Sequence, residues 1–196
     1  IQQDQQSYFG TVKYNAQQNN FYVNLQYELN YNEHELKTGI SYRYLKLNED
    51  ISFTDTFLKR TYAGNYNRTD RIPGFFAENT MRFLDDKITW IAGLRSDFLN
   101  GSKMRLTPRT LLKIDVTPNT VIRTNIGSGW RVVNLFSENI GLLVSSRNIV
   151  FAEQLMPESA WNYGINLTQK FESEGGNLSG YLSADFYRTS FQNQVF

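Results

Sequence analysis

Apolar and polar residues alternate with a period of two along most of this 196-residue chain. The longest clean run covers 21–30, where odd positions from Phe21 to Leu29 are apolar or aromatic and even positions are polar. The same pattern flanks the tight turn Thr117-Pro118-Asn119 within 106–131. A period of two is typical of a β-strand with one apolar and one polar face, and the turn predicts a hairpin. With no credible helix, strands are predicted over 7–15, 21–30, 35–44, 75–84, 88–98, 110–116, 120–126, 161–171 and 178–187.

The connections between these strands alternate in length. In chain order they cover 16–19, 31–34, 48–74, 85–87, 99–105, 117–119, 128–160 and 172–177. Every second connection is tight, and the long loops 48–74 and 128–160 belong to the other set. Alternate connections of an antiparallel meander lie at one end, and outer-membrane barrels have short turns at one end and long loops at the other. We therefore predict an all-β fold, an antiparallel up-and-down meander of about nine strands that is part of a large transmembrane β-barrel.

Aromatic residues mark the ends of several apolar faces, for example Phe21 and Tyr31, or Trp161 and Phe171. The spacing matches the 9 to 11 residues that a tilted strand needs to cross a bilayer, with aromatic girdles at both interfaces. The apolar face would then meet outer-membrane lipid. The other face would line a lumen, because it carries too many charges for a packed core. Those charged residues are Arg43, Arg82, Arg95, Asp97, Arg109, Lys113, Asp115, Arg123 and Asp185.

A soluble β-sandwich remains the alternative, because its strands alternate in the same way. The apolar residues would then form a core between two sheets, and the polar faces would meet water. The function under this alternative is a carbohydrate-binding module. The uniform strand length, the loop asymmetry and the aromatic ends favour the barrel.

Composition excludes several classes of protein and of site. Twenty Lys and Arg nearly balance 19 Asp and Glu, so no nucleic-acid partner is expected. Without cysteine there is no disulfide or thiolate metal site, and the single histidine, His34, falls in a tight turn. We expect no catalytic residue, no metal, no cofactor and no enzymatic activity. The chain opens without a signal segment and stops in mid-pattern, so we expect an internal fragment without a signal peptide or plug domain.

Several short motifs occur in an order that resembles the barrel of TonB-dependent outer-membrane receptors, particularly those of the Bacteroidetes type. The resemblance covers 70–196 well and the first 70 residues by pattern only. The motifs are FAENT at 76–80, GLRSD at 93–97, LTPR at 106–109, GSGWR at 127–131, NLFSEN at 134–139, SSR at 145–147 and PES at 157–159.

This resemblance implies a barrel of about 22 strands with a plugged lumen, located in the cell outer membrane. The implied function is active uptake of a scarce nutrient, most simply a ferric siderophore or another small nutrient. The implied partners are lipid, the plug domain of the same full-length chain, and TonB, which would act through an N-terminal part not present here.

Binding residues are expected in the two long loops, where arginines and aromatic rings suit anionic, planar or sugar-like ligands. The alternative is that these residues hold the loops to each other and to the plug. A second group of cations would face the lumen and contact the plug or acidic neighbours. The loop candidates are Arg60, Tyr62, Tyr66, Arg68, Arg71, Trp130, Arg131 and Arg147, and the lumen candidates are Arg95, Arg109, Lys113 and Arg123.

Overall fold

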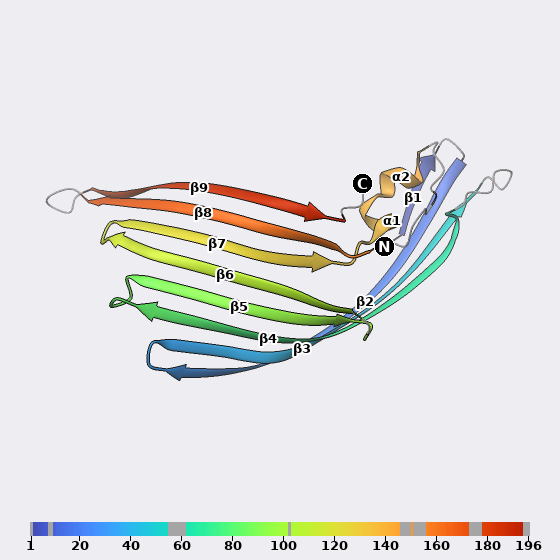
Figure 1. Cartoon of the computed structure of the whole chain (residues 1–196). Coiled ribbons are helices and arrows are strands. Elements are labelled where there is room, and N and C mark those ends of the chain that lie inside the picture. Colours follow the sequence, from blue (N-terminus) through green and yellow to red (C-terminus); the bar gives the residue numbers. More distant parts are fainter. Residues whose placement is uncertain are drawn as a thin grey trace.

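A single curved sheet of nine antiparallel strands, arranged in chain order, makes up most of the molecule (Figure 1). The computed structural model describes residues 2–7, 10–54, 62–101, 103–145, 150, 156–172 and 178–193. The all-β meander predicted from the sequence is therefore confirmed. The strands are β1 (Gln2–Ser7), β2 (Gly10–Tyr31), β3 (His34–Phe53), β4 (Gly64–Phe83), β5 (Ile88–Leu99), β6 (Lys103–Thr117), β7 (Thr120–Arg131), β8 (Glu158–Glu172) and β9 (Ser179–Gln192).

The apolar face of this sheet is open. Leu25 and Tyr27 on β2 keep 62% and 64% of their surface exposed, and Phe186 on β9 keeps 65%. In a sandwich these side chains would be covered by a second sheet, whereas the described residues form one sheet only. The sandwich alternative is therefore wrong.

Residues 10–15 and 21–30 of the first two predicted strands lie in one continuous strand, β2, so the predicted turn at 16–19 is wrong. Ser7 is the last residue of β1, and 8–9 lie outside the described residues. Residues 16–19 pair with Lys46 to Glu49 of β3 without a break. Their polar composition suggested a turn, but residues 17–19 have exposed side chains within the continuous strand. The predicted count of nine strands agrees with the structure only because two errors cancel. Two predicted strands correspond to a single strand, β2, and β1, at the start of the chain, was not predicted.

The two predicted long loops are shorter than 48–74 and 128–160. β3 continues to Phe53 and β4 begins at Gly64, so the first connection covers only 54–63. The second covers 132–157 and contains two single-turn helices, α1 (Leu135–Glu138) and α2 (Ile140–Leu143), which correct the prediction of no helix. Neither of these helices is long or apolar enough to cross a membrane.

The alternation of connection lengths remains. Both long connections lie at one end of the sheet, which we call the outer end, and the tight turns 32–33, 84–87 and 118–119 lie at the inner end. Two of these tight turns use left-handed backbone, with φ of 50° at Asn32 and 66° at Asp86. Asn and Asp tolerate this region better than most residues, which explains their place in the turns.

The curved sheet has a concave face and a convex face, and the two faces differ in polarity (Figure 1). Arg68 on β4 contacts Val133 and Asn134, which follow β7, although β4 and β7 are three strands apart in the sheet. Such a contact is possible only across the inside of the curve. The face that bears Arg68 is therefore the concave face. Through the strand alternation it also bears Asn24 on β2, Ser41 on β3 and Arg95 on β5.

The outer ends of β2, β3 and β4 have the opposite polarity from the rest of these strands. We call residues 10–20, 45–53 and 64–72 the overhang, and residues 21–31, 34–44 and 73–83 the belt. In the belt the convex face is apolar, as at Leu25, Ile40 and Phe75. In the overhang the buried apolar side chains lie on the concave face, and the convex face is polar. The buried apolar residues of the overhang are Val12, Tyr14, Leu47, Ile51 and Ile72.

Candidate functional site

A hollow of about 490 Å³ lies on the concave face near the outer end of the sheet. Register places its residues together: Tyr22 of β2 is paired with Arg43 of β3, and Arg95 of β5 is paired with Thr107 of β6. The site is thus built from side chains of five strands rather than from the long loops. Its lining residues are Tyr22, Arg43, Arg95, Asp97, Thr107, Ser128, Gly129 and Trp130.

Trp130, near the end of β7, is the aromatic centre of the hollow. The guanidinium carbons of Arg43 and Arg105 lie 5.8 and 5.4 Å from its ring centroid. Both distances fall within the range of cation–π attraction. The pairing of β7 with β6 ends at Gly127, while its pairing with β8 continues to Arg131, so residues 128–131 leave β6. This departure brings the indole to the concave cations, although strict alternation would point it outward.

An ion pair forms the fixed side of the hollow. Arg95 Nη2 lies 2.7 Å from Asp97 Oδ1 and donates a hydrogen bond of 2.7 Å to Ser41 Oγ. Gly74 of β4 leaves the room for this cluster, because a Cβ at that position would collide with the Asp97 carboxylate and lie 2.9 Å from Ser41 Oγ. The charge of Arg95 is therefore already neutralised within the wall.

Arg43 and Arg105 are the available charges of the site. Neither forms a salt bridge with any of the residues that the structure describes. Among the described residues, two polar atoms near the hollow, Arg105 Nε and Ser128 Oγ, are buried and have no hydrogen-bond partner. Buried donors of this kind normally have partners, and leaving one unpaired costs about 1 to 3 kcal/mol. The hollow thus offers positive charge and an aromatic face, while these two unpaired groups are covered by protein atoms.

A second hollow of about 310 Å³ continues the first along the concave face and shares Arg95, Thr107 and Ser128 with it. Here Arg109 Nη2 lies 2.6 Å from Glu78 Oε2, so the wall is polar but its charges are paired. No group of three or more His, Asp or Glu side chains that could hold a metal occurs in the described ranges. The arrangement suits binding and passage of a polar ligand.

Three of the predicted loop candidates lie in packing between the loops and the overhang. Tyr62 is fully buried, and its hydroxyl donates to the Leu143 carbonyl at 3.2 Å. The Tyr66 hydroxyl donates to the Tyr62 carbonyl at 2.8 Å. Arg68 donates to the Val133 carbonyl at 2.7 Å and to the Asn134 side chain. These contacts fit the alternative that the residues hold the loops together.

The loop packing has an apolar centre with one buried acid. Val12, Tyr14, Ile51 and Tyr62 pack with residues from α1 and α2. The Tyr14 hydroxyl donates to Glu49 Oε1 at 2.7 Å. Burial, and then the hydrogen bond and negative charge of Glu49, raise the pKa of the Tyr14 hydroxyl. Burial and the Glu49 charge also raise the pKa of Tyr66. Both rings are therefore neutral parts of the packing.

The remaining loop candidates are dispersed. Arg71 lies exposed on the convex face of β4. Arg131 pairs with Glu158 at 2.7 Å and with Glu138 at 2.9 Å, which ties β7 to β8 and to α1. Arg60 and Arg147 lie outside the described residues. Of the loop candidates that the structure describes, Trp130 alone lines the hollow.

The four predicted lumen residues all lie on the concave face, and all four have local partners. Arg95 pairs with Asp97 and Arg109 with Glu78, as described above. Lys113 Nζ lies 2.8 Å from Asp115 Oδ2, and Arg123 donates to Asn166 Oδ1 at 3.2 Å. These contacts are with neighbours in the wall, and contact with a plug remains a prediction.

The sequence analysis did not select Tyr22, Arg43 and Arg105 as binding residues. Tyr22 and Arg43 belong to the polar alternation, but nothing in the sequence distinguishes them from the other polar positions. Arg105 was assigned to a loop, whereas β6 begins at Lys103. Continuing the period of two backward from Arg109 would have placed Arg105 on the polar face.

The comparisons with known proteins agree with one another on the fold of this chain. The whole chain, residues 1–196, matches the family model described as "TonB dependent receptor-like, beta-barrel". Similar solved structures include the siderophore receptor PirA from Pseudomonas aeruginosa, at 14% identity and a TM-score of 0.59, covering 97% of this chain and 37% of that one. The copper transporter OprC has 16% identity and a TM-score of 0.59, covering 91% of this chain and 30% of that one.

The ferric enterobactin receptor PfeA, in complex with BCV-L6, has 16% identity and a TM-score of 0.54, covering 93% of this chain and 28% of that one. No curated protein matches. The chain thus spans about a third or less of the length of several of these structures, and at such identities they show the fold alone. The match over its full length nevertheless assigns the chain itself: it belongs to the family of TonB-dependent receptor β-barrels, which are located in the outer membrane.

Proposed function

We propose that this chain forms part of the wall of a receptor for active uptake of an anionic nutrient that carries planar rings, with a ferric siderophore as the first candidate. The observation that carries the proposal is Trp130 lying beside two guanidiniums that have no acidic partner among the described residues. Among the similar structures, one is named a siderophore receptor and another a copper transporter, so their names support uptake without identifying the ligand.

The hollow has the groups needed to recognise such a ligand. A carboxylate or catecholate oxygen would accept charge-assisted hydrogen bonds from the guanidiniums of Arg43 and Arg105, which lie at the Trp130 ring. A planar ring would stack against Trp130, which lines the hollow. The wall would contribute binding only, and no covalent step is needed.

Transport would require the partners that the family resemblance implies. The plug would occupy the concave side, and TonB would supply energy through it. Several charges of the wall are paired, as in Arg109 with Glu78. If the plug moved along these pairs, it would form and break polar contacts, and no buried charge would be left without a partner. The Bacteroidetes type of receptor also remains a prediction.

Calorimetric titration of the intact receptor tests this function. Wild-type protein should bind a ferric catecholate or ferric carboxylate chelate in preference to a neutral oligosaccharide. Arg105→Gln should weaken binding by roughly tenfold or more, because a hydrogen bond to a charged group contributes about 1.5 to 3 kcal/mol. Trp130→Ala should weaken it about three- to thirtyfold.

Lys87→Gln is the matched control, because Lys87 lies in a turn at the inner end, far from the hollow. It should leave the dissociation constant unchanged. Preference for the neutral sugar, or equal affinity of Trp130→Ala and wild type for the ferric chelates, would reject the proposal.

A further inference from the structure

We propose that the concave wall of β7, β8 and β9 carries a binding site for a zwitterionic α-amino acid, with Arg123 holding its carboxylate and Asp185 holding its ammonium group. This site is separate from the hollow at Trp130 and takes a ligand of a different chemical class. It rests on the geometry of the wall and not on the anionic ligand proposed for that hollow.

Arg123, Asn166 and Asp185 form one row across three neighbouring strands. Register pairs Arg123 of β7 with Asn166 of β8, and Asn166 with Asp185 of β9. Two strand spacings, or about 9 to 10 Å, therefore separate the backbone at Arg123 from the backbone at Asp185. The row thus presents a cation and an anion on the concave face, with an amide between them.

Asn166 holds the two charged groups in place. Its Oδ1 accepts hydrogen bonds from Arg123 at 3.2 Å and from Thr168 at 3.0 Å. Its Nδ2 donates to Asp185 Oδ1 at 2.7 Å and to Ser183 Oγ at 2.8 Å. These four bonds use the full capacity of a side-chain amide, so they fix its orientation. The amide therefore keeps Arg123 and Asp185 apart.

Both charges are available to a ligand. Arg123 and Asp185 are exposed, and neither forms a salt bridge within the part of the chain that the structure describes. The neighbouring cation in the same row, Lys113 of β6, is neutralised by Asp115 at 2.8 Å. A ligand with a single charge would be attracted by one of the two groups and repelled by the other. A zwitterion satisfies both, so the row favours a zwitterion.

An aromatic ring lies next to the Asp185 carboxylate. The Tyr187 hydroxyl is 3.5 Å from Asp185 Oδ1. The Tyr187 ring occupies the space above Gly164 of β8, where an added Cβ would lie 2.6 and 2.8 Å from two ring carbons and 2.7 Å from Asn125 Oδ1. Glycine therefore leaves the room that this ring needs. A ring beside a carboxylate favours an ammonium group, because cation–π attraction adds to the charge pairing.

An apolar patch in the polar wall suits the side chain of the ligand. Ile91, Leu111 and Asn125 continue the row of Gly164 across β5, β6 and β7. All three line a hollow of about 430 Å³. Leu111 and Arg123 occupy diagonal positions on adjacent strands, about 7 to 8 Å apart. A large apolar side chain, such as that of phenylalanine, would therefore reach this patch from the charged row.

Equilibrium dialysis of the intact receptor in detergent, with radiolabelled L-phenylalanine as the probe, tests the site. Three competing analogues each lack one part of the ligand: phenylalaninamide lacks the carboxylate, 3-phenylpropanoate lacks the ammonium group, and glycine lacks the ring. Each should bind roughly tenfold or more weakly than phenylalanine, since a charge-assisted hydrogen bond and the burial of a phenyl ring each contribute about that factor. Because the plug would occupy this side of the sheet, the intact receptor also tests access to the wall.

Two substitutions assign the charged groups. Arg123→Gln should weaken binding of phenylalanine roughly tenfold without weakening phenylalaninamide, which has no carboxylate to lose. Asp185→Asn should weaken phenylalanine and phenylalaninamide without weakening 3-phenylpropanoate. The analogue that each variant still binds as well as wild type shows that the site is folded.

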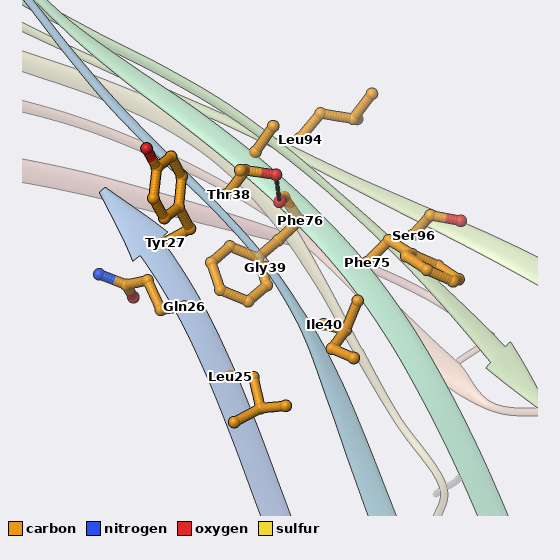
Figure 2. Close-up of a pocket in the computed structure, with 11 residues that line it drawn as sticks. Leu25, Gln26, Tyr27, Thr38, Gly39, Ile40, Phe75, Phe76, Leu94 and Ser96 are labelled. Atoms are coloured by element: carbon orange, nitrogen blue, oxygen red, sulfur yellow. Dashed lines mark hydrogen bonds between the residues drawn. The ribbon is translucent and has the colours of Figure 1, made fainter. Parts of the chain in front are cut away.

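Two control variants lie on the convex face. Arg188 is also on β9, but it is paired with Tyr163 on the opposite face, so Arg188→Gln should bind phenylalanine as wild type does. The belt has an apolar groove of about 620 Å³, and none of the residues that line it is charged (Figure 2). This groove would hold a phenyl ring but would not distinguish phenylalanine from its amide. Ala77→Phe should fill the groove without changing the affinity for phenylalanine.

Three results would overturn the proposal. The first is an intact receptor that does not bind phenylalanine, and the second is equal affinity for phenylalanine and phenylalaninamide. The third is equal loss of phenylalanine binding in Arg123→Gln and Arg188→Gln.

Discussion

The belt and the overhang are parts of the same three strands, yet they are built with opposite polarity. Both have an unbroken antiparallel ladder, from Val12 to Tyr31 on β2 paired with β3. In the belt Leu25 is 62% exposed on the convex face, and in the overhang Ile51 is 1% exposed on the concave face. Backbone hydrogen bonding is the same in both regions, so the difference lies in what covers each face.

The environment on each side accounts for this inversion. We propose that in the belt lipid covers the convex face and the concave face meets a polar lumen, which would explain why apolar side chains point outward. In the overhang, water meets the convex face, and the 132–145 segment with α1 and α2 covers the concave face. A strand that passes from membrane to water therefore changes the apolar face without changing its register.

The largest expected difference between the regions comes from deleting an aromatic ring. Phe136→Ala removes a buried ring that packs against Tyr66 at 4.6 Å, and should destabilise the docked 132–145 segment by about 3 to 5 kcal/mol. Phe75→Ala in the belt should cost little, because lipid chains replace the lost contacts. Hydrogen exchange of the intact receptor should show lost protection over 132–145 in the first variant only. Unchanged protection in Phe136→Ala would mean that the overhang has no real core.

A charge placed on the convex face should distinguish the regions in the opposite sense. Leu25→Arg in the belt should cost about 2 to 4 kcal/mol of unfolding free energy, as for a cation facing lipid near the bilayer midplane. Gln17→Arg in the overhang should change stability by no more than about 0.5 kcal/mol, because Gln17 is exposed to water. Guanidinium unfolding in lipid vesicles measures both. Similar costs at the two sites would remove the boundary that we place near Phe21.

The sequence predicted the belt well and the overhang poorly, for a physical reason. Alternation across 21–30 and 35–44 fixes both the strands and their lipid-facing sides, because lipid demands an apolar residue at every second position. In the overhang, the polar run Gln17 to Asn20 resembles a turn, and the apolar residues that continue the strand have moved to the other face. The boundary therefore appears in the sequence as a break in the pattern.

The candidate site was less predictable than the fold. Trp130 was identified from the loop-end motif, but its partners Arg43 and Arg105 come from strands far away in the sequence. Their meeting depends on the curvature of the sheet and on the departure of β7 from β6 after Gly127. Neither feature has a local sequence pattern. Arg68 and Tyr62 resembled ligand-binding residues because loop anchors and ligand contacts use the same side chains.

A smaller difference should come from removing one arginine in each region. Arg68→Gln would break the contacts with Val133 and Asn134 and leave Asp70, which is 4% exposed, without its cation, at a cost of about 1.5 to 3 kcal/mol. Arg109→Gln in the wall should cost about 1 kcal/mol or less, because its side chain is 67% exposed. Hydrogen exchange over 132–145 checks the first, and global unfolding checks the second. Arg68→Lys should fall between, since it keeps the charge but loses the forked contact with the loop.

The smallest expected effect is a dependence on pH confined to the overhang. The pKa of Tyr14 is raised by burial and by Glu49, so the docked form keeps the hydroxyl proton that the undocked form releases near pH 10. The stabilisation is therefore complete below pH 10 and is lost as pH rises above it. Linkage gives a loss of about 1 kcal/mol between pH 10 and pH 11. Hydrogen exchange over 132–145, corrected for the intrinsic rate, should show this loss in wild type and a smaller loss in Tyr14→Phe, where only the raised pKa of Tyr66 still contributes. The belt should show no matching change, because its apolar face has no buried tyrosine hydroxyl that titrates in this range. An equal loss in Tyr14→Phe and wild type would assign the effect to another group.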